Sequence, residues 1–171
     1  MAAGLSACTS AAPLADAPKV QASSTASCGF TRIESDLLRR VNEFRAAPRT
    51  CGARGRFAAA SPLRWSGALA RLATAHANDM SARNELSHDD ASGRGPAQRA
   101  TQAGYGWSVF AENVAGHHAG TAEVMAGWQQ SAGHCANLMN PAVTEFGVGC
   151  SPGTPGSRFK TYWAMELAKP R

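Results

Sequence analysis

The chain has 171 residues and a net charge of +5, which describe a basic protein of one domain. A chain of about 150 residues buries roughly 68–70% of its unfolded surface, so its core requires no structural metal. Residues 28–65 contain eight arginines and only three acids, and this local excess of five equals the whole net charge. Such an excess attracts anionic lipid head groups or nucleic acid. No nucleic-acid-binding signature accompanies it, so no nucleic-acid partner is expected and a solvated surface is the simpler interpretation.

The N-terminal residues indicate export. Residues 1–7 are too short for a full signal peptide or a membrane span, but Leu5-Ser6-Ala7-Cys8 resembles a bacterial lipobox, in which the cysteine becomes lipidated. We therefore expect residues 1–8 to be the residual end of a lipoprotein-type signal, with Cys8 as the membrane anchor. Residues 9–27, rich in Ala, Ser, Thr and Pro, would be a flexible tether. Residues 28–171 would fold as one exported domain, anchored to the bacterial envelope or secreted or periplasmic.

Four cysteines remain once Cys8 is assigned to lipid, and four cysteines allow three pairings. We expect the sequence-local disulfides Cys28–Cys51 and Cys135–Cys150, since closing a loop of about 15 residues stabilises by roughly 3 kcal/mol in the chain-entropy model. The alternative is a cytosolic protein with free buried thiols. A zinc site made of four cysteines is not expected, because the chain has no C-x2-C pair.

The first two predicted helices follow from apolar residues at helical spacing. Thr31 and Glu34 fit a capping box at the start of the first helix, which should end before Pro48. Its apolar stripe is Leu37, Leu38, Val41 and Phe44. After a loop over residues 49–61, Ser66 should cap a second helix. Its apolar face includes His76, which we assign to the core or its boundary.

The second half of the chain mixes helices with strands. A short third helix should begin near Pro96 and stop at Gly104. Thr121 should cap a fourth helix. Strands are predicted over residues 110–115, 143–150 and 159–167. This order favours an α+β protein, a three-layer α-β-α sandwich around a small, mostly antiparallel central sheet.

His88, Glu112 and His134 are the candidate functional side chains, and His134 is expected on a backbone bend that follows Gly133. Two neutral imidazoles and a carboxylate could bind Zn²⁺ and leave one position open for water. The same three groups could instead form a hydrogen-bonded polar cluster. Their spacing along the chain does not show that they meet.

Several short motifs, in a consistent order over roughly residues 30–168, resemble the bacterial branch of the CAP superfamily, the family of cysteine-rich secretory proteins, antigen 5 and pathogenesis-related proteins. They are Ser87-His88, Glu112-Asn113-Val114-Ala115, Trp128, the stretch from Gly133 to Pro141, Phe146-Gly147-Val148-Gly149 and Tyr162-Trp163.

The resemblance implies an α-β-α sandwich with a central cleft that carries two histidines and two acids in many members. His88 and His134 match the two histidines, and Glu112 matches one acid. Ser131 stands where the second acid is expected, so the set is incomplete. Asn113 and Asn137 are expected to hydrogen-bond to loop backbone rather than to a substrate.

We therefore expect an exported binding or interaction module whose His/Glu cleft takes a divalent metal or a lipid- or sterol-like ligand. An envelope or host protein is the other partner class, and the cleft edges or the basic helix would bind it. No cofactor is required, and Zn²⁺ or another divalent cation is the candidate metal, with His88, His134 and Glu112 as ligands. The alternative is a metal-dependent, peptidase-like hydrolase with Glu112 as general base. No residue is assigned as catalytic, since no separate nucleophile is evident. A purely structural role for the cluster is the third interpretation.

Overall fold

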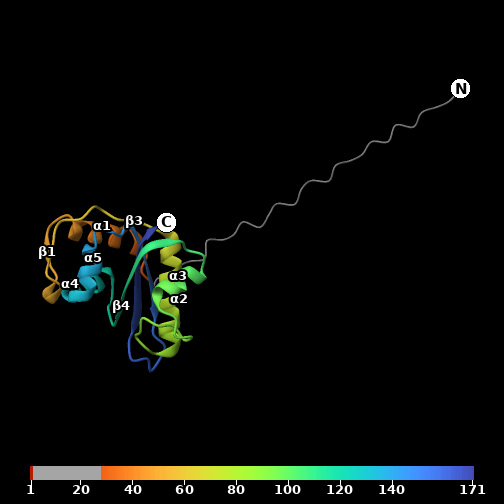
Figure 1. Cartoon of the computed structure of the whole chain (residues 1–171). Helices are drawn as coiled ribbons and strands as arrows, with labels where there is room; N and C mark the ends of the chain where they lie inside the picture. Colours follow the sequence, from red (N-terminus) through yellow and green to blue (C-terminus); the bar gives the residue numbers. More distant parts are fainter. Residues whose placement is uncertain (2–27) are drawn as a thin grey trace.

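A computed structural model describes Met1 and residues 28–171 (Figure 1). The expected lipidation site Cys8, the tether, and the signal residues other than Met1 lie outside the described residues. Among the residues described, no helix has the length and apolar character needed to cross a bilayer.

The central sheet has four strands in the order β3-β5-β6-β4. β3 (Arg64–Trp65) runs parallel to β5 (Glu145–Pro152). β6 (Thr161–Pro170) pairs antiparallel with β5 on one side and with β4 (Trp107–Gly116) on the other. The sheet is therefore small and mostly antiparallel, as predicted, and β4 forms one of its edges.

Helices cover both faces of this sheet (Figure 1). α1 (Ile33–Arg45), α4 (Thr121–Gln130) and α5 (Ala132–Met139) lie on one side. α2 (Gly67–Arg83) and the short α3 (Pro96–Gln102) lie on the other. The predicted three-layer α-β-α arrangement is confirmed.

The predicted loop over residues 49–61 contains short elements that the sequence pattern missed. β1 (Arg49–Thr50) pairs antiparallel with β2 (Arg56–Phe57), and a 3-10 turn, η1 (Gly52–Arg54), joins them. Strands of two residues are too short to show a period, so periodicity gave no signal for them.

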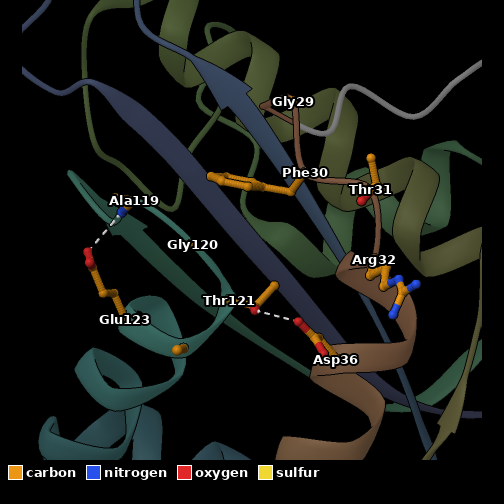
Figure 2. A pocket seen from close by; sticks show the side chains of 10 residues that line it. Gly29, Phe30, Thr31, Arg32, Asp36, Ala119, Gly120, Thr121 and Glu123 are labelled. Carbon is orange, nitrogen blue, oxygen red and sulfur yellow. Dashed lines mark hydrogen bonds between the residues drawn. The ribbon is translucent and has the colours of Figure 1, made fainter.

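Three predicted helix starts have different outcomes. Ser66 caps α2, its hydroxyl accepting from the Leu69 N–H at 3.5 Å. The capping box at Thr31 and Glu34 is wrong, since α1 follows Arg32 without a side-chain cap. Thr121 is not the cap of α4 either; Gly120 is, and the Thr121 hydroxyl donates to Asp36 of α1 at 3.2 Å (Figure 2).

Side chains alternate between the two faces of β6, and this alternation determines toward which face Glu166 points. Trp163, Met165 and Leu167 belong to the large core beneath α1, α4 and α5. Tyr162 and Ala164 belong to the small core on the opposite face, with Ala73 of α2. Glu166 continues this second row, so it points toward the side of the sheet covered by α2 and α3.

Two glycines let α2 lie directly on β5. A Cβ added at Gly147 would stand 2.1 Å from the Ala70 nitrogen, and one at Gly149 would stand 2.2 Å from the Thr74 nitrogen. Because the obstructing atoms belong to the backbone of α2, no rotamer change relieves the clash. These glycines bring helix and sheet close together.

Gly147→Ala should destabilise the fold by about 2–3 kcal/mol, the upper part of the range for overpacked cores. Gly133→Ala is the matched control, since its added Cβ meets nothing within 4 Å, and it should stay within about 0.5 kcal/mol of wild type or gain from helix propensity. Urea unfolding of both variants measures the difference. If both variants lost the same unfolding free energy, the close approach of α2 to β5 would not require glycine at position 147.

The predicted disulfide pairing is wrong. The bonds are Cys28–Cys150 and Cys51–Cys135, with Cα atoms 5.7 and 5.4 Å apart. Tertiary packing decides the partners: η1 packs against α5, and a Cβ at Gly52 would lie 3.2 Å from the Ala132 side chain. That packing brings Cys51 beside Cys135, whereas local spacing along the chain says nothing about it.

Candidate functional site

Two buried carboxyl groups face each other at the centre of the site. Glu112 of β4 and Glu166 of β6 are direct cross-strand partners, and they are 5% and 1% exposed. This register places the two carboxyl groups side by side, so that the charge of each acts on the other. Burial raises the pKa of Glu112 to about 7, despite the opposing charge of Arg99. Burial, and then the charge of Glu112, hold the pKa of Glu166 well above its usual range.

The pair favours keeping a proton. The pKa values of both acids are raised, and burial is the largest cause for each of them. Within residues 28–171, the buried Oε2 of Glu166 also lacks any donor. A proton shared by the pair therefore reduces the number of unpaired buried groups.

Arg99 of α3 is the cation of the cluster. Its Nη2 donates to Oε2 of Glu112 and lies 3.5 Å from Oε1 of Glu166. Its Nη1 donates to the backbone carbonyls of His88 and Arg94, at 2.5 and 3.0 Å. Arg99 thus connects the buried carboxyl pair to the loop that carries His88.

His88 is the exposed member of the site. Its Nδ1–H donates to Oε1 of Glu112 at 2.7 Å, while 53% of its side chain remains exposed. The other ring nitrogen, Nε2, is then the unprotonated one in the neutral imidazole. A buried carboxylate therefore fixes both the tautomer and the orientation of an accessible imidazole.

His76 joins the cluster from α2. It is 1% exposed, as expected for a core histidine. Its Nε2 lies 2.8 Å from the Ser87 carbonyl and 3.7 Å from Oε2 of Glu112. Burial, and then the charge of Arg99, lower the pKa of His76 to about 4, so the ring is neutral at pH 7.

His134 lies on α5, so the predicted backbone bend after Gly133 is wrong. The Asn113 side chain donates to the His134 carbonyl at 3.2 Å, and Asn137 donates to the Glu112 carbonyl at 3.1 Å. These bonds fix α5 against β4. Both asparagines bond to backbone, as expected, but to a helix and a strand rather than to a loop. Burial, and then the charge of His88, lower the pKa of His134.

The arrangement does not provide three ready metal ligands. Both carboxylate oxygens of Glu112 already accept hydrogen bonds, one from His88 and one from Arg99. In the part of the chain that the structure describes, no group of three or more His, Cys, Asp and Glu side chains could hold a metal ion. Glu112 therefore fits the orienting role, which leaves His88 and His134 as candidate ligands.

Sequence reasoning missed Arg99 and Glu166. Glu166 stands between Met165 and Leu167 in the buried part of β6, residues 162–168, where it is the one charged residue. A charged residue in a buried strand requires a partner, and this signal could have identified it. Arg99, in a short polar helix, gave no comparable signal.

A pocket of about 480 Å³ lies apart from this cluster, where the segment leading into α1 meets the start of α4. Figure 2 shows Phe30 and Thr31 on one side of it and Ala119 to Glu123 on the other. The Glu123 carboxylate accepts from the Ala119 N–H at 2.9 Å within this pocket. None of its lining residues belongs to the His88–Glu112 cluster.

Comparison with known families gives a match over most of the folded domain. Residues 38–167 match the model of the cysteine-rich secretory protein family, CAP. The uncharacterized protein YkwD of Bacillus subtilis (strain 168) is 31% identical over 88 residues, which are 52% of this chain and 34% of that relative. The chain thus spans about a third of the length of this curated relative.

Solved structures give the same fold. An extracellular protein with an SCP domain from Bacillus anthracis aligns with a TM-score of 0.56 and 26% identity, over 64% of this chain and 34% of that one. An outer surface protein of Borrelia burgdorferi gives 0.59 and 18%, over 66% and 80% of the chains. Venom allergen-like protein 4 of Schistosoma mansoni gives 0.56 and 12%, over 83% and 91%. At these identities the last two show the fold alone.

Proposed function

Because the chain belongs to the cysteine-rich secretory protein (CAP) family, we propose that it is an exported binding module that recognises its ligand through the imidazole of His88. The observation that carries this proposal is the 2.7 Å hydrogen bond from the exposed His88 to the buried Glu112. Glu112 is only 5% exposed and contacts little solvent, whereas the His88 imidazole that it holds is accessible. Such a pair presents one accessible nitrogen in a fixed direction.

A divalent cation is the ligand to test first, with Zn²⁺ as the probe. Histidines that bind metals commonly donate their second ring N–H to a carboxylate, as His88 does to Glu112. His134 would supply a second imidazole, since its helix, α5, is hydrogen-bonded through Asn137 to the backbone carbonyl of Glu112. With only two protein ligands, solvent must complete the coordination, so we expect binding in the micromolar range rather than the tight binding of structural zinc sites.

The hydrolase alternative receives less support from the same geometry. A general base must be free to accept a proton from the attacking water. Each oxygen of Glu112 already accepts a hydrogen bond, from His88 or from Arg99. A binding role therefore agrees better with the contacts than catalysis by Glu112 does.

Export and the remaining partners are also proposals. The structural neighbours include an extracellular protein and an outer surface protein, and the two disulfides suit an oxidising compartment. A lipid anchor at Cys8, or a secreted or periplasmic location, follows from the sequence interpretation alone. A lipid- or sterol-like ligand would be sought in the pocket beside Phe30 (Figure 2). An envelope or host protein is the remaining partner class.

Calorimetric titration with Zn²⁺ at neutral pH should show one-to-one binding at micromolar Kd. The full chain would carry Cys8→Ser, so that the N-terminal thiol contributes no ligand. His88→Ala and His134→Ala should each weaken binding at least tenfold, the effect expected from losing one of two ligands. Glu112→Gln should weaken it roughly tenfold, by loss of the orienting carboxylate.

His117→Ala is the matched control, because His117 is exposed, lies outside the cluster and contacts Phe159. This variant should bind Zn²⁺ like the parent protein. Absence of binding by the parent, or equal binding by the His88 and His134 variants, would refute the metal ligand. If those variants changed only the melting temperature, a structural role for the cluster would replace the binding role.

A further inference from the structure

A pocket of about 360 Å³ lies in the seam between α1 and α4, and arginines from two segments line it. Arg40 comes from α1, and Arg49 comes from β1 just after it. Ala122, Met125 and Gln129 of α4 form the facing wall. The pocket shares no residue with the His88–Glu112 cluster, so the proposed metal or ligand site leaves it without an assigned role.

Arg49 is held in place by its neighbours. Its Nε donates to the Phe44 carbonyl at 2.9 Å, and its guanidinium carbon lies 4.6 Å from the centre of the Phe44 ring. Within residues 28–171, its terminal nitrogens make no hydrogen bond. A guanidinium fixed by stacking and by one backbone bond loses little conformational freedom when it binds an anion.

Arg40 contributes a donor that has no acceptor. Its Nε is buried and, among the residues that the structure describes, has no hydrogen-bond partner. A buried N–H without an acceptor costs free energy. The Nε itself is closed off from the pocket, so an anion seated there would be bound by the terminal nitrogens of Arg40, which lines the pocket.

The acid in this pocket does not neutralise these two arginines. Glu43 also lines the pocket, but Arg39 binds both of its carboxylate oxygens, at 3.0 and 2.9 Å. Among residues 28–171, no acid forms an ion pair with Arg40 or Arg49, so both keep their positive charge for a ligand. They belong to the same segment, residues 28–65, that carries the whole charge excess of the chain.

We propose that this pocket, between α1, β1 and α4, binds a phosphate group through Arg40 and Arg49. Two guanidiniums match the charge and the several acceptor oxygens of a phosphate, which accepts paired hydrogen bonds from arginine. The methyl and thioether groups of Ala122 and Met125 allow a small organic body to accompany the phosphate. The ligand is therefore an organic phosphate, and its source is either a phospholipid headgroup or a soluble phosphate ester.

Two assays on the full chain test this site and separate the sources. Glycerol phosphate is titrated by calorimetry, and phosphatidylcholine vesicles containing phosphatidylglycerol are tested by co-sedimentation at the same salt concentration. Arg40→Gln and Arg49→Gln should each reduce binding about tenfold or more, the expected effect of losing a charged hydrogen-bond donor. Arg49→Lys keeps the charge but not the paired donors, and should recover only part of the affinity.

Arg54→Gln is the matched control, since it removes one charge from an exposed arginine of the same segment outside the pocket. It should change binding less than twofold. Binding of the soluble ester without binding to the vesicles assigns the site to a soluble ligand, and binding to the vesicles assigns it to a headgroup. The proposal is overturned if neither binds, or if Arg54→Gln weakens binding as much as Arg40→Gln. Melting temperatures without ligand confirm that each variant is folded.

Discussion

Replacing Cys51 and Cys135 by alanine should lower the free energy of unfolding by about 3–4 kcal/mol. The Cys28–Cys150 bond that remains still links the two positions through segments 28–51 and 135–150, so the loop that opens counts as roughly 40 residues in the chain-entropy model rather than the full separation of 84. Both cysteines are 1% exposed, and alanine places no unpaired hydroxyl in the core. Since domains are typically stable by about 5–15 kcal/mol, this loss is a large fraction of the total stability.

Urea unfolding of the oxidised wild type and the double alanine variant measures this loss, and Cys8→Ser controls for the removal of a thiol. Peptide mapping without reduction should recover Cys51 linked to Cys135 and Cys28 linked to Cys150. A peptide linking Cys28 to Cys51 would contradict the pairing. A loss of less than about 1 kcal/mol would contradict the energetic argument.

The sequence predicted most of the fold because its signals there were local. Helical spacing identified α1 and α2, and Pro96 and Gly104 correctly bracketed α3. The disulfide partners were not local: Cys150 lies in the central strand β5, and Cys28 is 122 residues away in the sequence. Such partners depend on how layers pack, and periodicity contains no information about that.

The site was predicted only where a motif existed. His88 and Glu112 were identified and do meet, at 2.7 Å. Glu166 and Arg99 complete the cluster because β4 pairs with β6 in one particular register and α3 packs against β4. A shift of one residue in that register would turn Glu166 to the opposite face, so its role depends on sheet pairing rather than on its own neighbours in the sequence.

Arg99→Met should cost about 3–5 kcal/mol at pH 8, the range for breaking a buried ion pair by removing one partner. Arg99 lowers the pKa values of both Glu112 and Glu166, so its loss raises them further. An acid whose pKa in the folded state lies above its unfolded value loses stabilising free energy as the pH rises between the two values. In the wild type, Glu112 causes this loss between its unfolded pKa of 4.5 and its folded pKa of about 7. In the variant the folded pKa is higher, so the loss continues to higher pH.

At pH 5 the loss should shrink to about 1–2 kcal/mol, the contribution of the hydrogen bonds from Arg99 to the carbonyls of His88 and Arg94. His76 reinforces this trend. The pKa of His76 is lowered from 6.5 to about 4 in the folded protein. As the pH falls between these two values, the unfolded chain gains a proton at His76 and the folded protein does not, so the folded protein loses stability. Arg99 is one cause of that lowering, so the pKa of His76 should be closer to its usual value in the Arg99→Met variant. The variant should therefore lose less stability through His76 as the pH falls.

Urea unfolding at pH 5 and pH 8, with a chelator present, tests this difference. Arg39→Met is the matched control: its ion pair with Glu43 is exposed on both sides, so it should cost under about 1 kcal/mol at either pH. Adding Glu166→Gln to Arg99→Met should recover part of the loss at pH 8, since one buried acid then remains instead of two. Equal losses at the two pH values, with no rescue, would show that Arg99 acts through packing and backbone bonds rather than through the charge of the carboxyl pair.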